Sequence, residues 1–323
     1  MIYGRQRFEM QLEEIEVLLS ESKGQENRVF WLYHNNFRTY FFMLQGLARL
    51  YAKAHNKKLF TKIRDKAKEV EDAFGWLDFY NHYTYSFVRS KSISVEVKSF
   101  FKEKLEQRTE ACHKILKKEG WYNGDRIKKI RKQLKEADWK DENVEAELFT
   151  EIYKIEAKEI LQFLRDHEFQ FVDMEHDVHE LRRKLRWLSI YPQALQGAVK
   201  LVANAKDKLT LDKYHTDEII NSHFNQFKPS RNLATHLKLA KPQFLALSWI
   251  IAELGDLKDK GQRIEVLTYA LMKVEGLTKE KAIEKTYTLL AKNYPKEEVL
   301  LKKASEISQE LASLAVLENL VID

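Results

Sequence analysis

The sequence predicts an all-α protein, and two observations carry this prediction. Apolar residues recur at spacings of three and four along almost the whole chain, which is the period of an amphipathic helix. Glycine and proline are scarce, with 10 and 4 among 323 residues, although the turns of β-sandwiches and β-barrels draw heavily on both. A helical period with few turn residues predicts a small number of long helices.

In the first half, the apolar period predicts helices over residues 8–24, 28–55, 63–74, 77–88, 94–118, 126–137 and 143–166. The interruption between the third and fourth helices is placed at Gly75 because glycine weakens a helix interior. The fifth helix is expected to end at Gly120 and Gly124, which suit left-handed C-terminal caps.

In the second half, the same period predicts helices over residues 174–191, 193–205, 242–254, 264–274 and 279–293, and a last helix after Pro295. Pro192 is expected to break or kink the first of these helices. Pro242 fits the first turn of the third, and Gly255 is expected to cap its end. Residues 206–230 are more polar and predict a loop or short helical pieces, followed by a short piece over 232–240.

A chain of 323 residues exceeds what one compact core usually holds. Two units are therefore expected, an N-terminal helical bundle over residues 1–168 and a C-terminal helical bundle over 169–323. No Ser/Gly-rich linker and no low-complexity tract separates them, so the two units are expected to pack directly on each other.

The net charge of +6 favours acidic partners such as nucleic acid or a phosphate polymer. Cys112 is the single cysteine, so no intrachain disulfide can form, which suits a reducing compartment. The N-terminal residues lack the apolar core of a signal peptide. The longest strongly apolar run, over residues 244–252, is too short to cross a bilayer. These features predict a cytoplasmic protein without a membrane partner.

The segment over residues 174–191 has the most informative pattern. One helical face is apolar, with Val178, Leu181, Leu185 and Leu188. An adjoining face is cationic, with His176, His179, Arg182, Arg183 and Arg186. Like charges at helical spacing destabilise a helix slightly. A bound anion would offset this cost, and so would acidic residues of a neighbouring helix, so both interpretations stay open.

These residues, followed by Leu254, Gly255 and Asp259, resemble the CHAD family, the conserved histidine α-helical domain. Its hallmark is His-x-x-Arg with further basic residues at helical spacing, and later a Leu-Gly-x-x-x-Asp junction. The resemblance implies two pseudo-symmetric antiparallel four-helix bundles packed side by side as one unit. It also implies a basic channel that binds inorganic polyphosphate, with no catalysis, no metal and no cofactor.

The family pattern occurs once in each half, so the resemblance also implies a degenerate copy in residues 1–168. Its residues are His34 and Arg38, followed by Phe74-Gly75-Trp76-Leu77-Asp78. On a continuous helix His34, Arg38 and Gln45 share one face. They are therefore expected to form a second, weakened part of the same site.

The expected ligand contacts follow from side-chain chemistry. Arg182, Arg183 and Arg186 would hold phosphate oxygens, because the planar guanidinium offers paired donors. His179 would add a donor when it is protonated. Lys258 and Lys238 are further candidates from around the junction helix. The cluster Lys128, Lys129, Arg131 and Lys132 extends the channel or forms a solvated face.

Two alternative functions remain open. Glu110 and His113 have the Glu-x-x-His spacing of a ferritin-like di-metal carboxylate bundle. A nucleic-acid or protein-interaction scaffold is the other alternative. Its base-stacking or core aromatic residues would be Phe41, Phe42, Tyr80, Tyr83, Tyr85 and Phe87. The sequence contains no P-loop, no Gly-rich dinucleotide loop and no Gly-x-Ser-x-Gly motif, so an enzyme is not expected.

Overall fold

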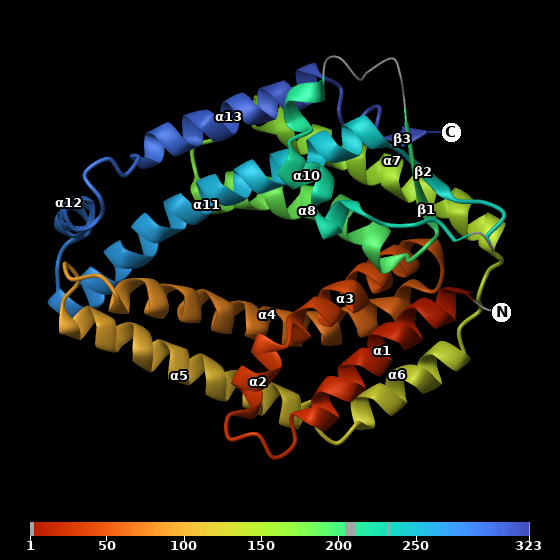
Figure 1. Cartoon of the computed structure of the whole chain (residues 1–323), viewed down its shortest axis with the longest axis horizontal. Helices are drawn as coiled ribbons and strands as arrows, with labels where there is room; N and C mark the ends of the chain where they lie inside the picture. Colours follow the sequence, from red (N-terminus) through yellow and green to blue (C-terminus); the bar gives the residue numbers. More distant parts are fainter. Residues whose placement is uncertain (1–2, 204–210, 231–232, 323) are drawn as a thin grey trace.

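The computed structural model describes residues 3–203, 211–230 and 233–322, and the first half of the chain is entirely helical there (Figure 1). Its helices are α1 (Tyr3–Glu21), α2 (Arg28–His34), α3 (Phe37–Ala54), α4 (Lys57–Val88), α5 (Val95–Lys118), α6 (Asp125–Lys135) and α7 (Glu142–Asp166). Side chains that accept from the first turn cap several helices, among them Asn56, Ser94 and Asp141.

The second half begins with a π-helical turn, η1 (Met174–His179), which leads directly into α8 (Glu180–Ala194). Short elements follow, and they are β1 (Val199–Val202), η2 (Asp212–Tyr214), α10 (Asp217–Asn221), η3 (His223–Asn225) and β2 (Leu237–Ala240). The remaining elements are α11 (Lys241–Glu275), α12 (Lys279–Leu289), α13 (Glu297–Ser313) and β3 (Val321–Ile322).

The all-α prediction is confirmed, and a small sheet is added to it. Strand β2 lies in the middle, parallel to β1 and antiparallel to β3. The predicted helix over 193–205 is wrong, because α8 runs through Pro192 and ends at Ala194. Gln196 and Gly197 both adopt positive φ there, which stops the helix. Residues 204–210 and 231–232 lie outside the described residues.

Three predicted helix boundaries are also wrong. The helix over 28–55 is two helices, because Asn36 is left-handed at φ 57° and turns the chain between α2 and α3. Helix α4 continues through Gly75, and α11 continues through Gly255. Neither glycine ends a helix.

The two halves share apolar cores. The larger core runs from Phe8 of α1 to Leu320 and includes the packing of α3 against α8. A separate, smaller core joins Tyr83 and Phe87 of α4 to Leu267 and Leu271 of α11. In Figure 1 this second junction lies where α4 and α11 converge beside α12. From this junction towards the other end of the molecule, α4 and α11 diverge in the same view.

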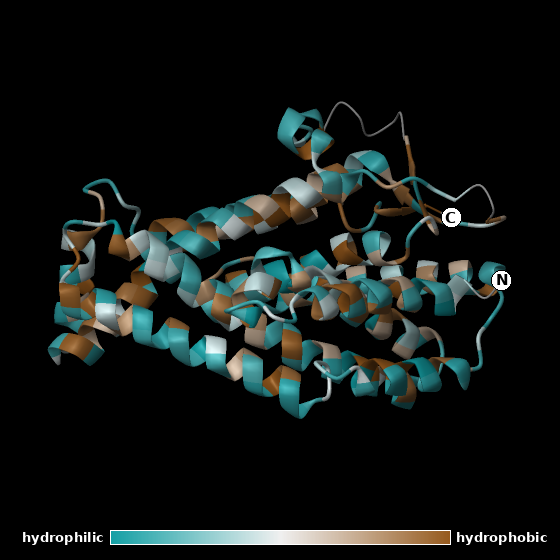
Figure 2. Ribbon diagram, turned by 60° about the horizontal axis from the view of Figure 1, so that its bottom comes forward, coloured by the Kyte–Doolittle hydropathy of each residue, from teal (hydrophilic) through white to brown (hydrophobic). Residues whose placement is uncertain are grey.

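The helices are amphipathic, with apolar and polar residues alternating along each ribbon (Figure 2). Helix α6 illustrates this, because Ile127, Ile130 and Leu134 are buried while Lys129 and Lys132 are exposed. Among the helices of the described residues, none combines the length and the apolar character that a membrane crossing requires.

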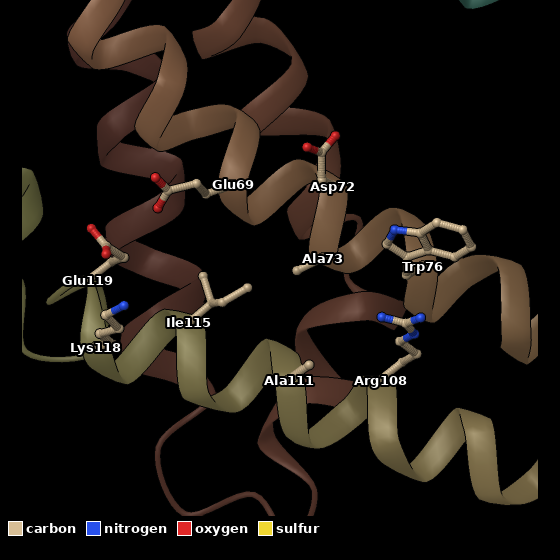
Figure 3. Close-up of a pocket in the computed structure, with 9 residues that line it drawn as sticks. All are labelled: Glu69, Asp72, Ala73, Trp76, Arg108, Ala111, Ile115, Lys118 and Glu119. Atoms are coloured by element: carbon tan, nitrogen blue, oxygen red, sulfur yellow. The ribbon is translucent and has the colours of Figure 1, made fainter.

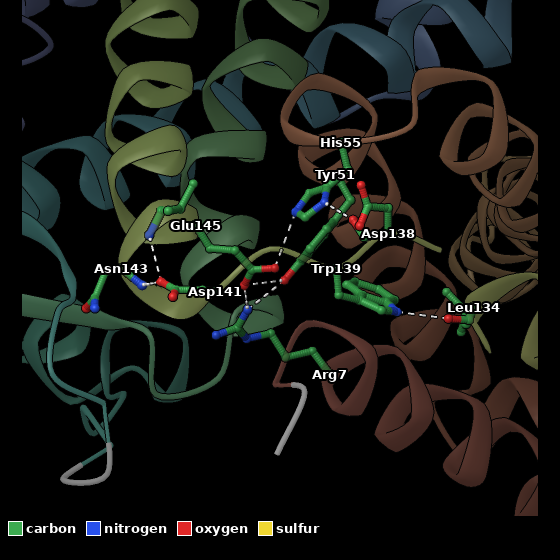
Figure 4. A network of polar contacts seen from close by, with 10 residues as sticks. Arg7, Tyr51, His55, Leu134, Asp138, Trp139, Asp141, Asn143 and Glu145 are labelled. Atoms are coloured by element: carbon green, nitrogen blue, oxygen red, sulfur yellow. Dashed lines mark hydrogen bonds and ion pairs between the residues drawn. The ribbon is translucent and has the colours of Figure 1, made fainter. Parts of the chain in front are cut away.

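A buried polar network ties α1, α3 and α7 together (Figure 4). Glu145 accepts from Nη1 of Arg7 over 2.8 Å and from the hydroxyl of Tyr51 over 3.0 Å. Nε2 of His55 lies 3.3 Å from its other oxygen, and Nδ1 of His55 lies 3.1 Å from the carbonyl of Asp138. Arg7 and Glu145 are only 5% and 2% exposed, so each neutralises a charge that water cannot reach.

Candidate anion-binding site

Three arginines from two helices come together at the packing of α3 against α8. The guanidinium carbons of Arg38 and Arg186 each lie 5.0 Å from the centre of the Phe42 ring. Arg182 stands one helical turn before Arg186 on α8, and both Arg182 and Arg38 act electrostatically on Arg186. The sequence analysis named all three arginines, and the structure places them in one cluster, hereafter the arginine cluster.

A glycine in the middle of a long helix receives an arginine in each half. A Cβ at Gly75 of α4 would lie 2.6 Å from Nη2 of Arg38. A Cβ at Gly255 of α11 would lie 2.9 Å from Nε of Arg182. Such contacts are closer than real Cβ atoms allow, so only glycine lets each guanidinium lie against the helix. The two glycines are therefore packing notches, and the prediction that Gly255 caps a helix is wrong.

Arg38 is largely neutralised within the protein. It donates from Nε and Nη2 to Oε1 of Glu71 over 3.0 and 2.7 Å. Its Nη1 donates to Oδ2 of the half-exposed Asp78 over 3.3 Å. Both carboxylates belong to α4, on either side of the Gly75 notch, so α4 supplies the surface and the counter-charge for Arg38.

The arginines of α8 lack such partners. Arg182 donates from Nε to the carbonyl of Ile251 over 3.2 Å. Neither Arg182 nor Arg186 has a carboxylate within 4.0 Å among the described residues. Burial, and then the charges of Arg182 and Arg38, lower the pKa of Arg186 to about 10. Arg186 is therefore still a cation at neutral pH, and the charge of Glu71 offsets its own only in part, from beyond ion-pair distance.

The other cationic residues expected on this helix are already paired. Nδ1 of His179 lies 2.9 Å from Oε2 of Glu175, and the exposed Arg183 forms an ion pair with Glu180. On α11, Nζ of Lys258 lies 2.6 Å from Oδ1 of Asp259. Each of these three residues thus has an acidic side chain within ion-pair distance.

His34 and Lys238 do not join the arginine cluster. The left-handed Asn36 separates His34 on α2 from Arg38 on α3, so the expected shared helical face does not exist. His34 packs instead against the rings of Phe30 and Tyr33. Lys238 lies on β2, ahead of α11, and the 14 residues from Lys241 to Gly255 rise about 21 Å along the helix.

The sequence analysis missed Arg263. It lies four residues after Asp259 and eight after Gly255, so the three positions share one face of α11. Its Nε is buried without a hydrogen-bond partner among the described residues, and its guanidinium lies 5.2 Å from the centre of the Phe87 ring. The four-residue spacing from Gly255 was the signal that could have found it.

The residues named for the two alternative functions lie outside the arginine cluster or are buried in the core. Phe41, Tyr80, Tyr83 and Phe87 are core residues, whereas Tyr85 is 59% exposed and lies under Arg89. Glu110 pairs with Lys114 at 3.6 Å. The described residues contain no group of three or more His, Cys, Asp or Glu side chains that could hold a metal ion.

Cys112 is a free cysteine buried in the larger apolar core. Burial raises the pKa of its thiol to about 12. A thiolate, the nucleophilic form, is therefore scarce at neutral pH.

A cavity of about 330 Å³ opens between α4 and α5 (Figure 3), and none of the three arginines of the cluster lines it. Its floor is apolar, with Ala73, Ala111 and Ile115. The guanidinium of Arg108 lies 4.9 Å from the Trp76 ring at one end. The carboxylates on its rim are paired with lysines, including Glu119 with Lys66 at 2.9 Å. Nothing in this cavity matches the chemistry of the arginine cluster.

Comparisons with protein-family models, with curated proteins and with solved structures find no match for this chain.

Proposed function

We propose that this chain binds a polyanion at the arginine cluster, and that the polyanion is inorganic polyphosphate. The observation that carries the proposal is Arg186, a part-buried cation beside two further arginines, with no carboxylate within 4.0 Å of it in the part of the chain that the structure describes. An uncompensated buried charge lowers stability unless a partner supplies the opposite charge. A phosphate group supplies that charge and matches the paired donors of a guanidinium.

We propose further that the chain is a divergent relative of the CHAD family. The support is that one local arrangement recurs in both halves, an arginine of one helix lying on a glycine of the next long helix. The pairs Arg38–Gly75 and Arg182–Gly255 are the counterparts that an internal repeat requires. Binding of this kind needs only fixed positive charge, so it requires neither a reactive group nor a cofactor.

We favour polyphosphate over nucleic acid as the ligand because few of the candidate aromatic rings are exposed. Binding of single-stranded nucleic acid uses exposed rings on which bases stack. Most of the candidate rings are in the core, and Phe42 lies against Arg38 and Arg186. The site therefore offers donors for phosphate oxygens and few surfaces for bases.

Titration calorimetry with long-chain polyphosphate, at low and at moderate salt, tests the proposal. We expect binding that weakens about tenfold or more over this range, because the ligand releases the counter-ions it carried. RNA at the same phosphate concentration should not displace it. Absence of binding at low salt by a folded sample would rule the proposal out, and displacement by RNA would favour the nucleic-acid alternative.

Substitution of Gly255 by alanine should separate binding from stability. The new methyl group must push the guanidinium of Arg182 out of its notch, and we expect the affinity for polyphosphate to fall roughly five- to tenfold. The unfolding free energy should change by less than about 1 kcal/mol, because the helix gains propensity and the displaced group is flexible. A double-mutant cycle with Arg182→Gln checks this, since the alanine should have no further effect once Arg182 is gone.

A further inference from the structure

Glu71, the acidic partner of Arg38, lies where its negative charge would act on any anion bound at the arginine cluster. Glu71 is 8% exposed and receives two hydrogen bonds from Arg38 on a single oxygen. Its charge also acts on Arg186, where it opposes the two neighbouring arginines. One buried carboxylate therefore serves two of the three guanidiniums.

The charges of the cluster show what this carboxylate does. Arg38, Arg182 and Arg186 contribute three positive charges, and Arg38 pairs with the two carboxylates of Glu71 and the half-exposed Asp78. Asp259, which pairs with Lys258, acts on Arg182 from beyond ion-pair distance. Asp78 is screened by water, whereas Glu71 is not. Among the described residues, an incoming phosphate group therefore finds two guanidiniums without a carboxylate in ion-pair distance, on Arg182 and Arg186, and a third that is already paired with a carboxylate.

We propose that Glu71 is an internal counter-anion that competes with the ligand for Arg38 and so determines which phosphates the site accepts. This inference rests on the function proposed above and narrows it. Two free guanidiniums suit one phosphate group, either the end of a long chain or a short oligophosphate. Further phosphate units placed against Arg38 would be repelled by Glu71, and the repulsion grows with the number of ligand charges near it.

The test compares wild type with Glu71→Gln, which removes the charge and keeps the size and one acceptor oxygen of the side chain. Pyrophosphate, tripolyphosphate and long-chain polyphosphate are each titrated by calorimetry. We expect Glu71→Gln to bind all three more tightly, with the largest gain, roughly 10- to 100-fold, for the long chain. The matched control is Asp72→Asn, which removes the same charge one residue along, where Asp72 pairs with Lys68 on the exposed side of α4.

The outcomes separate this inference from the proposed function. Wild type that binds polyphosphate, with Glu71→Gln unchanged or weaker, would overturn the inference alone and leave Glu71 as a residue that only positions Arg38. No binding by either protein would overturn both. Thermal unfolding with and without tripolyphosphate gives a second reading. The free Glu71→Gln protein should melt lower than Asp72→Asn, and the ligand should raise its melting temperature more than that of wild type.

Discussion

Replacement of Arg182 and Arg186 together by glutamine is expected to weaken binding of long-chain polyphosphate by at least about 100-fold. Each guanidinium would make charge-assisted hydrogen bonds to phosphate, worth about 1.5–3 kcal/mol, and no other described arginine of the cluster is free to replace them. Unlike most changes at buried positions, this one should not destabilise the chain.

The sign of the stability effect follows from the pKa of Arg186. Its folded pKa of about 10 lies below the ordinary value of an arginine side chain, so folding disfavours its charged form. That cost is fully present at neutral pH and is relieved only as the pH rises above about 10. A neutral glutamine removes it, and we expect the unfolding free energy to stay equal or to rise by about 1–2 kcal/mol.

Calorimetry and chemical denaturation of the double variant measure both effects. The matched control is Lys129→Gln/Lys132→Gln, which removes two charges from the exposed face of α6. If binding depends on the arginine cluster, the control should lose less than about fivefold in affinity, through net charge alone. Equal losses in the two variants would mean that polyphosphate is attracted by overall charge and has no site on α8.

Substitution of Glu145 by alanine is expected to lower the unfolding free energy by about 3–5 kcal/mol. The change leaves Arg7 as a buried charge without its partner, and the hydroxyl of Tyr51 loses its acceptor as well. The loss should be larger than that of most single substitutions because the network joins three helices that are distant in sequence.

Denaturation by urea measures this loss, with Glu147→Ala as the control from the exposed side of the same helix. The control should change the unfolding free energy by no more than about 0.5 kcal/mol. A paired replacement, Arg7→Met with Glu145→Leu, should recover much of the loss, because it removes both charges together. If Glu145→Ala behaved as Glu147→Ala does, the network would contribute nothing beyond its apolar packing.

Much of the fold could be predicted because amphipathic helices are local features. The apolar period locates α1, α5 and α7 to within a few residues. The sheet could not be found in this way, because β2 depends on partners that lie about 40 and 80 residues away along the chain. Short strands of this kind have no period long enough to separate them from a helical segment.

The arginine cluster was partly predictable for a related reason. The cationic face of α8 follows from spacing within one helix, so Arg182 and Arg186 could be named. The meaning of Gly255 could not, because a glycine after an apolar run suits a helix cap and a packing notch equally well. Only the position of Arg182 on the neighbouring helix distinguishes the two. The pairing of Glu71 with Arg38, across 33 residues, likewise depends on how α3 and α4 meet.

The contacts that hold the arginines in place also affect how tightly the cluster could bind a ligand. A free arginine side chain has about 2 kcal/mol of rotamer entropy, which is lost when it is fixed on a ligand. Here the ring of Phe42 and the glycine notches restrict these side chains as the protein folds. Much of the ordering is thus complete before an anion arrives, and the enthalpy of each new hydrogen bond is retained more fully as affinity. If the arginine cluster binds an anion as proposed, it does so with side chains that are already ordered in the free protein.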